Sequence, residues 1–66
     1  MPWNEAFYPP AMRHLSEAAR AKAVEIANAL LAGGADEGRA IRIAIAKARA
    51  WARDHGLPER DDQDGG

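Results

Sequence analysis

Several absences narrow what this sequence can encode. It contains no cysteine, which excludes disulfides and thiolate metal sites. No apolar run approaches the roughly 20 residues that a membrane-spanning helix needs, so we expect no membrane segment. Neither sign of charge dominates, and the net charge of −1 gives no whole-molecule attraction to nucleic acid or to an anionic membrane. The first residues lack the basic-then-apolar layout of a secretory signal, and we expect a cytoplasmic protein.

The chain is also short. With 66 residues it lies near the lower size limit for a hydrophobic core that is stable alone. Apolar burial and the entropy of ordering nearly cancel in such a chain, so it needs a further source of stability. Because disulfides are excluded, self-association is the simplest remaining source, and we expect a homodimer.

Composition divides the chain into three segments. Residues 1–15 hold three of the four aromatic residues and three of the four prolines, which predicts an extended arm that ends in a short turn or helix. Residues 16–56 are rich in alanine, with a helical periodicity that a glycine pair interrupts once. Residues 57–66 are acidic and end in glycine, which predicts a disordered tail behind a single helical domain of residues 1–56.

Capping residues predict where two helices begin and end. Ser16 and Asp36 are good N-caps, and Gly34 suits the left-handed position that follows a helix. These signals predict helices at about 16–33 and 37–54. Because so few residues connect them, the two helices should be antiparallel. The predicted fold class is therefore all-α, a helical hairpin with an aromatic and proline-rich arm at its N-terminus.

Alanines dominate the apolar stripes of both helices. Ala27, Ala44 and Ala48 let the helix axes approach closely, but each buries little area. A hairpin built in this way is under-filled, and the large side chains of the arm are the natural filler. The expected filler residues are Trp3, Phe7, Tyr8, Met12 and Leu15.

Four arginines share the face of the second helix that lies opposite its apolar arc. Such a stripe suits the phosphate backbone of a nucleic acid, with the hairpin acting as a helix-turn-helix-like unit. The alternative is a solvated face whose arginines favour helix formation and cover apolar surface with their stems. We favour this alternative, because the helix has no Asn, Gln, Ser or Thr to read base edges and the acidic tail could fold back on the stripe. The arginines are Arg39, Arg42, Arg49 and Arg53.

One isoleucine of the second helix lies outside the apolar arc and would be exposed in a lone hairpin. The apolar face of the first helix is also wider than one partner helix requires. Both features favour a homodimer with a four-helix arrangement, or another protein as partner. The leading prediction is a non-enzymatic, self-associating protein-interaction module. Its predicted surface residues are Trp3, Phe7, Tyr8, Val24, Leu31 and Ile43.

Residues that could carry chemistry are few and scattered. The two histidines, His14 and His55, have no second ligand at helical spacing, so we expect no metal site and no cofactor. Ser16 serves as a helix cap rather than as a nucleophile. The acidic residues of the tail lack the remaining positions of a calcium loop. No catalytic residue is predicted, and we expect no enzyme.

Several stretches of the chain together resemble a known group of proteins. They are Met1-Pro2-Trp3, the aromatic pair before the prolines, residues 23–31 with Gly34 after them, residues 36–41, and Ala46-Lys47-Ala48 with Trp51-Ala52. Over residues 1 to about 55 the set resembles small bacterial conserved hypothetical proteins of the YdaT-like kind. Its layout is more distantly similar to ChaB. The resemblance implies a helical fold and a bacterial cytoplasmic setting, and it carries over no functional residue.

Overall fold

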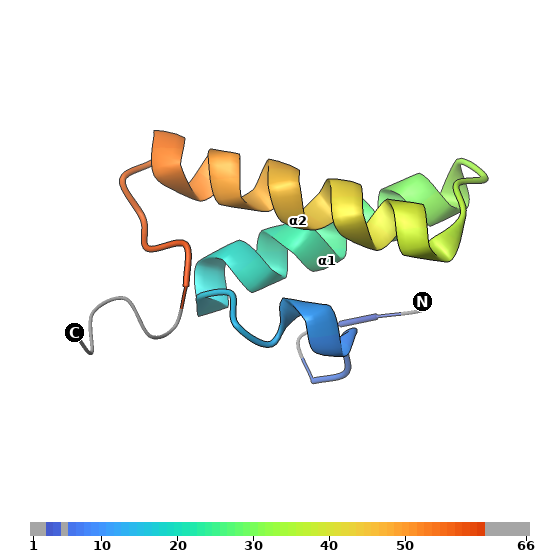
Figure 1. Cartoon of the computed structure of the whole chain (residues 1–66), viewed down its shortest axis with the longest axis horizontal. Helices are drawn as coiled ribbons and strands as arrows, with labels where there is room; N and C mark the ends of the chain where they lie inside the picture. The colour runs from blue at the N-terminus through green and yellow to red at the C-terminus, as the bar shows by residue number, and fades with distance from the viewer. Residues whose placement is uncertain (1–2, 5, 61–66) are drawn as a thin grey trace.

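The computed structural model describes residues 3, 4 and 6–60 and contains a pair of packed helices (Figure 1). A short 3-10 turn, η1 (Pro10–Met12), precedes α1 (Glu17–Ala32) and α2 (Glu37–Asp54). The two helices are antiparallel and packed along their length, which confirms the predicted all-α hairpin with a short N-terminal turn. Neither helix in this part of the chain is long and apolar enough to cross a membrane.

The ends of α1 follow the capping signals in the sequence. The Ser16 hydroxyl accepts a hydrogen bond from the backbone N–H of Ala19 at 3.1 Å, which satisfies one of the free donors of the first turn. At the other end Gly34 has a φ of +97°, a conformation that side chains disfavour. Its N–H and that of Ala35 donate to carbonyls of the last turn, at 2.9 Å and 3.0 Å respectively. This is the Schellman arrangement, and it turns the chain directly into the next cap.

The same pair of devices bounds α2. The Asp36 carboxylate accepts from the backbone N–H of Arg39 at 3.2 Å. Gly56, with a φ of +69°, follows the last residues of the helix, and the N–H of Leu57 donates to the carbonyl of Ala52 at 2.8 Å. Both helices therefore end where short-range hydrogen bonds can replace the helical ones.

The interface between the helices is a seam of alanines. Every member is fully buried, and the members recur every four residues along each helix. Because methyl groups occupy little space, the helix axes can lie near the short end of the usual 8–10 Å range. The seam consists of Ala19, Ala23 and Ala27 of α1 and Ala40, Ala44, Ala48 and Ala52 of α2.

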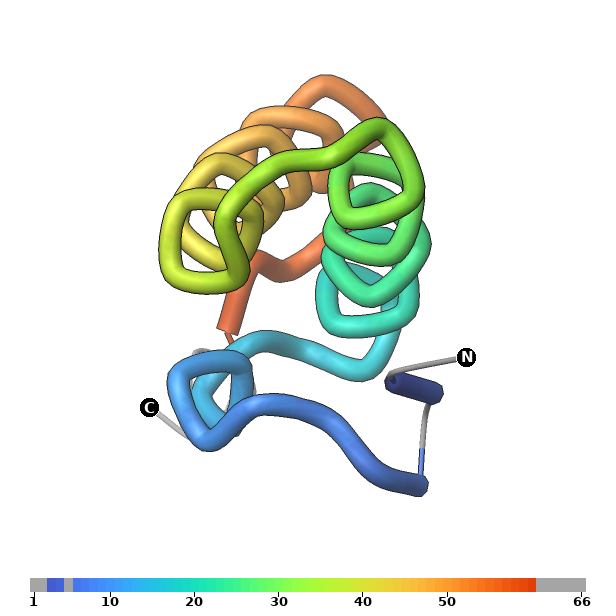
Figure 2. Tube along the Cα trace, turned by 90° about the vertical axis from the view of Figure 1, so that its right-hand side faces the viewer, coloured from blue at the N-terminus to red at the C-terminus, as the bar shows by residue number. Residues whose placement is uncertain are grey.

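The arm packs along one side of the helix pair, beneath both helices in Figure 2. Trp3 is 7% exposed and Met12 is fully buried, as predicted for the filler of a thin core. The side-chain amide of Asn28 donates to the backbone carbonyl of Trp3 at 3.0 Å and ties the arm to α1. The prediction that Tyr8 belongs to the core holds in part, because its ring is partly buried against the core.

The prediction that all three aromatic residues of the arm belong to the core is wrong for Phe7, because its side chain is 68% exposed. The side-chain oxygen of Asn4 accepts from the N–H groups of Ala6 and Phe7 at 2.8 Å each, and a backbone pair links Asn4 and Phe7. The chain therefore reverses between Asn4 and Phe7. Since neighbouring side chains on extended backbone point to opposite sides, Tyr8 faces the core and Phe7 faces away from it.

Residues 57–60 form a short segment that packs against the start of α1. The Ser16 hydroxyl donates to the carbonyl of Pro58 at 2.6 Å, and the Ser16 N–H donates to the carbonyl of Glu59 at 3.0 Å. The disordered tail that we predicted from residue 57 onward is therefore wrong for these four residues. The rest of the predicted tail, 61–66, lies outside the described residues.

Candidate functional site

Large apolar side chains lie on both sides of the alanine seam. On the side of the arm, Val24 of α1 lies beside Trp3, and Ile45 of α2 lies beside residues of the turn before α1. At 100° per residue, Leu31 and Ile41 share that side. Because the seam occupies the centre of the contact, the large side chains are displaced to its two edges.

The opposite edge carries a second apolar row, which we call the open flank. It is not covered by any part of the chain that the structure describes (Figure 2). Helical geometry places four large apolar side chains there, and each is only partly buried. Two lysines border them. The open flank consists of Lys22, Ile26 and Leu30 of α1 and Ile43, Lys47 and Trp51 of α2.

Trp51 forms one end of the open flank and is held by polar neighbours. The Nζ of Lys22 lies 5.4 Å from the centre of an indole ring and 3.3 Å from a carboxylate oxygen of Glu25. The ring of His55 lies against the indole, with the ring centres 4.8 Å apart, and its Nδ1 lies 2.8 Å from the Trp51 carbonyl at the C-terminus of α2. The indole is therefore fixed in place while part of it stays accessible.

The predicted interaction residues are not brought together by the fold. Trp3 and Val24, each 7% exposed, belong to the core of the protomer and offer no surface to a partner, which corrects their assignment. Leu31 and Tyr8 are partly buried on the side of the arm, where a guanidinium covers the tyrosine ring. Only Ile43 lies on the open flank, and the exposed Phe7 lies on the arm.

Sequence reasoning missed Ile26, Leu30 and Trp51 as surface residues. All three fall on apolar stripes together with the alanines. The sequence indicated that the apolar face of α1 is wider than one partner helix requires, but Val24 and Leu31 were predicted as its surface residues instead of Ile26 and Leu30. The signal that distinguishes them is size, because alanines repeating every four residues occupy the centre of a close helix contact and larger neighbours cannot join them there.

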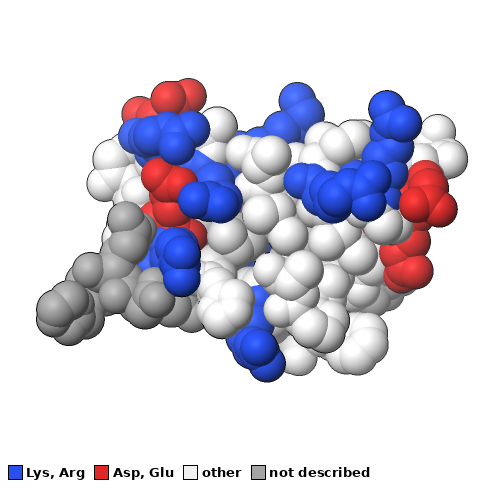
Figure 3. Space-filling model, in the orientation of Figure 1, with Lys and Arg blue, Asp and Glu red and all other residues white. Residues whose placement is uncertain are grey.

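The arginine stripe is divided into two groups. All four arginines are exposed, but Arg49 and Arg53 both bind the carboxylate of Glu59, at 3.2 Å and 3.4 Å. The prediction that acidic residues after α2 fold back on the stripe is confirmed for Glu59. Between Arg42 and Arg49 lies the exposed Ala46, over about 10 Å of helix. Figure 3 shows basic atoms toward both ends of the molecule, each group beside acidic atoms, with a further basic group at the upper edge between them.

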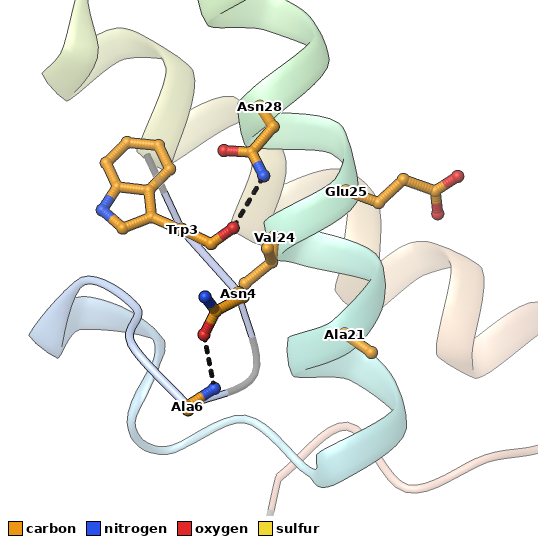
Figure 4. Close-up of a pocket in the computed structure, with 7 residues that line it drawn as sticks. All are labelled: Trp3, Asn4, Ala6, Ala21, Val24, Glu25 and Asn28. Carbon is orange, nitrogen blue, oxygen red and sulfur yellow. Dashed lines mark hydrogen bonds between the residues drawn. The ribbon is translucent and has the colours of Figure 1, made fainter. Parts of the chain in front are cut away.

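No group of three metal-ligating side chains comes together within residues 3, 4 and 6–60. Described residues line two hollows along the arm instead. The larger, about 630 Å³, is open to solvent and runs between the arm and α1 (Figure 4). In its wall the Oδ1 of Asn28 is buried and has no hydrogen-bond partner in the described part of the chain. The smaller hollow, about 200 Å³, lies between the turn before α1, α2 and the segment that follows α2.

Comparison with known proteins gives one informative relative. No protein-family model matches the chain, and no solved structure matches it. The chain is 45% identical over 62 residues to the uncharacterized protein YdaT of Bacillus subtilis (strain 168). The match takes in 94% of this chain and 41% of that protein, so the chain spans about two fifths of its relative's length. The resemblance to YdaT-like conserved hypothetical proteins that the residues indicated is thereby confirmed.

Proposed function

We propose that the chain is a small protein-interaction module that pairs with a second copy of itself through the open flank, and that it binds rather than catalyses. One observation supports this above all. The helices bury only alanines at the centre of their contact and leave Ile26, Leu30, Ile43 and Trp51 partly exposed along one edge. A row of this length that the rest of the described chain leaves open is typical of a docking surface.

A second copy suits this row because a two-fold interface is self-complementary. Two hairpins that pack their open flanks together form a four-helix arrangement, in which each row covers the other. The aromatic end and the bordering lysines also match the composition of interfaces, where an apolar centre is surrounded by a polar rim. Each hairpin then gains the second layer that its thin alanine core lacks.

The strength of this association follows from the side chains involved. Eight partly exposed apolar side chains, four from each copy, become buried in the dimer. If each contributes about 1 kcal/mol, the total is roughly 8 kcal/mol, which is comparable with the about 4–15 kcal/mol that association costs. We therefore expect a weak dimer that forms only at high protein concentration.

Binding of nucleic acid by the arginine stripe is the competing proposal, and the contacts support it less. Two of the four arginines already share the Glu59 carboxylate, and the other two, Arg39 and Arg42, lie about 10 Å or more from them along α2. A titration with generic duplex DNA at low salt tests this proposal, because phosphate contacts are strongest there. Measurable affinity that falls steeply with added salt would favour it over self-association.

Sedimentation over a concentration series tests the dimer. We compare the wild type with Ile43→Glu, which places a charge on the open flank, and with Ala46→Glu as a matched control. Ala46 is exposed on the outer face of the same helix, so the control introduces the same charge away from the flank. Circular dichroism establishes that each variant keeps its helices.

The expected result is a wild type and an Ala46→Glu variant that dimerise with increasing concentration, and an Ile43→Glu variant that is helical and monomeric. Leu30→Glu, on the partner helix of the same flank, should repeat the loss if Ile43→Glu fails to fold. A wild type that stays monomeric into the millimolar range would refute the proposal. Equal dimerisation of all variants would place the interface elsewhere.

A further inference from the structure

The order of side chains along the open flank restricts how two copies can meet there. Lys22 and Trp51 lie side by side at one end, with the Nζ 5.4 Å from an indole ring centre. Because the helices are antiparallel, Ile26 and Lys47 lie level with each other one turn farther along, about 6 Å from that end. The two remaining aliphatic residues form the other end, at about 12 Å. A lysine thus lies at the middle of the flank.

Lys47 is a cation without a partner in the protomer. Its side chain is exposed and forms no ion pair or hydrogen bond within the described part of the chain. The nearest carboxylate at the border of the flank belongs to Glu25 of α1. Its side chain is 69% exposed, binds Lys22 through one oxygen at 3.3 Å and extends away from the arm (Figure 4). A second copy that covers the flank must bring an anion to Lys47, because an unpaired charge in an apolar interface is costly.

Two copies related by a two-fold axis can cover each other's flanks in two ways. If the axis runs along the helices, α2 of one copy lies over α1 of the other, and every residue keeps its height. Lys47 then lies level with Ile26 and Glu25 of the second copy. If the axis runs across the helices, α2 lies over α2 and the heights are reversed about the middle of the flank. Lys47 of one copy then opposes Lys47 of the other.

Charge favours the axis along the helices. In that arrangement each Lys47 meets a carboxylate, and Lys22 lies within about one turn of Asp54, the last residue of α2 in the second copy. The axis across the helices brings Asp54 level with Arg39 instead. Both of these side chains are exposed, and ion pairs between exposed groups contribute little. The opposed lysines of that arrangement lie at the apolar centre, where like charges repel more strongly.

We propose that the two copies pair about an axis along the helices, and that Lys47 of one copy and Glu25 of the other form the ion pair that selects this arrangement. This assignment rests on the proposed dimer. The apolar side chains of the open flank provide the affinity, and the charges determine the orientation because the other arrangement brings like charges together. By symmetry the ion pair forms twice in each dimer.

Charge reversal tests the ion pair. Lys47→Glu brings carboxylates together in its homodimer, and Glu25→Lys brings ammonium groups together. Because each contact occurs twice, each variant should dimerise about tenfold more weakly than the wild type. An equimolar mixture of the two variants restores opposite charges at both contacts and should dimerise about as tightly as the wild type.

Arg42→Glu is the matched control, because it makes the same charge reversal on the outer face of α2. Alone it should dimerise like the wild type. Mixed with Glu25→Lys it should give no rescue, which separates the specific contact from attraction between oppositely charged molecules. Circular dichroism establishes that every variant keeps its helices.

Sedimentation over a concentration series measures each variant and each mixture. Weakened single variants and a restored mixture of Lys47→Glu with Glu25→Lys are the expected result. A Lys47→Glu variant that pairs more tightly with the wild type than with itself would indicate the axis across the helices and overturn the assignment. A mixture no tighter than its components would also overturn it, while loss of the wild-type dimer in Ile43→Glu would still support the proposed function. A monomeric wild type would refute both.

Discussion

Ser16 joins three parts of the fold through one small side chain, and its replacement by alanine gives a quantitative test. Its hydroxyl accepts from the first turn of α1 and donates to the carbonyl of Pro58, while its own N–H donates to Glu59. The residue is 7% exposed, so water replaces the lost hydroxyl poorly. Ser16→Ala therefore removes a helix cap and a long-range tether together.

The expected cost follows from these two contacts. Loss of a serine cap destabilises a protein by about 1 kcal/mol. Loss of the hydrogen bond to Pro58 leaves a partly buried carbonyl without its donor and costs about 1 kcal/mol more. The free energy of unfolding should fall by about 2 kcal/mol. For a domain of this size, that corresponds to a decrease in Tm of about 8–16 °C.

Asp36→Ala provides the matched control, because Asp36 caps α2 in the same way but is exposed and has no described contact with the C-terminal segment. Its replacement should cost only about 1 kcal/mol. Urea and thermal unfolding, followed by circular dichroism at constant protein concentration, measure both variants. Equal losses in the two variants would refute the reasoning, since they would show that the bond between Ser16 and Pro58 adds nothing to the cap.

Two further pairs of substitutions test the arm and the interhelical turn. Trp3→Ala should lower the free energy of unfolding by about 3 kcal/mol or more, because the indole is buried, whereas Phe7→Ala, at a side chain 68% exposed, should change it by less than about 0.5 kcal/mol. Gly34→Ala should destabilise by about 1 kcal/mol, since nothing crowds a Cβ there but the φ of +97° is strained, whereas Gly33→Ala, at a φ of −85° with only ordinary contacts, should stabilise by about 0.5 kcal/mol. Urea unfolding measures all four, and a destabilised Phe7→Ala or an unaffected Gly34→Ala would contradict the respective argument.

The helices were predictable because the signals that bound them are local. Ser16, Gly34 and Asp36 act within a few residues of their own positions, so their roles can be read from the sequence and agree with the structure. The exposure of Phe7 depends on a turn that the Asn4 side chain stabilises, and the proline content of the arm does not indicate this turn. The hydrogen bond between Ser16 and Pro58 was even harder to predict from the sequence, because 42 residues separate the partners.

The candidate surfaces were only partly predictable for a different reason. Helical periodicity shows which residues share a stripe, but it does not show which of them reach the centre of the contact. Ala44 and Trp51 point in nearly the same direction from the axis of α2. The alanine nevertheless has no exposed surface, whereas the tryptophan is partly accessible. The hollow between His14, Arg49 and Arg60 depends on three segments meeting, so no single stretch of sequence indicates it.

The alanine seam links the stability of the hairpin to its open flank. Methyl groups at the centre of the contact bring the helices close together, and this closeness leaves no room between them for isoleucine, leucine or tryptophan side chains. Those side chains must line both edges of the seam, and among the described residues the arm covers one edge and no segment covers the other. A larger residue at Ala44 would separate the helices and draw the flanking side chains inward. Alanine at the centre of the contact thus gives the hairpin a thin core and displaces the larger apolar side chains to the open flank. In the proposed dimer, a second copy packs on this flank and completes the core.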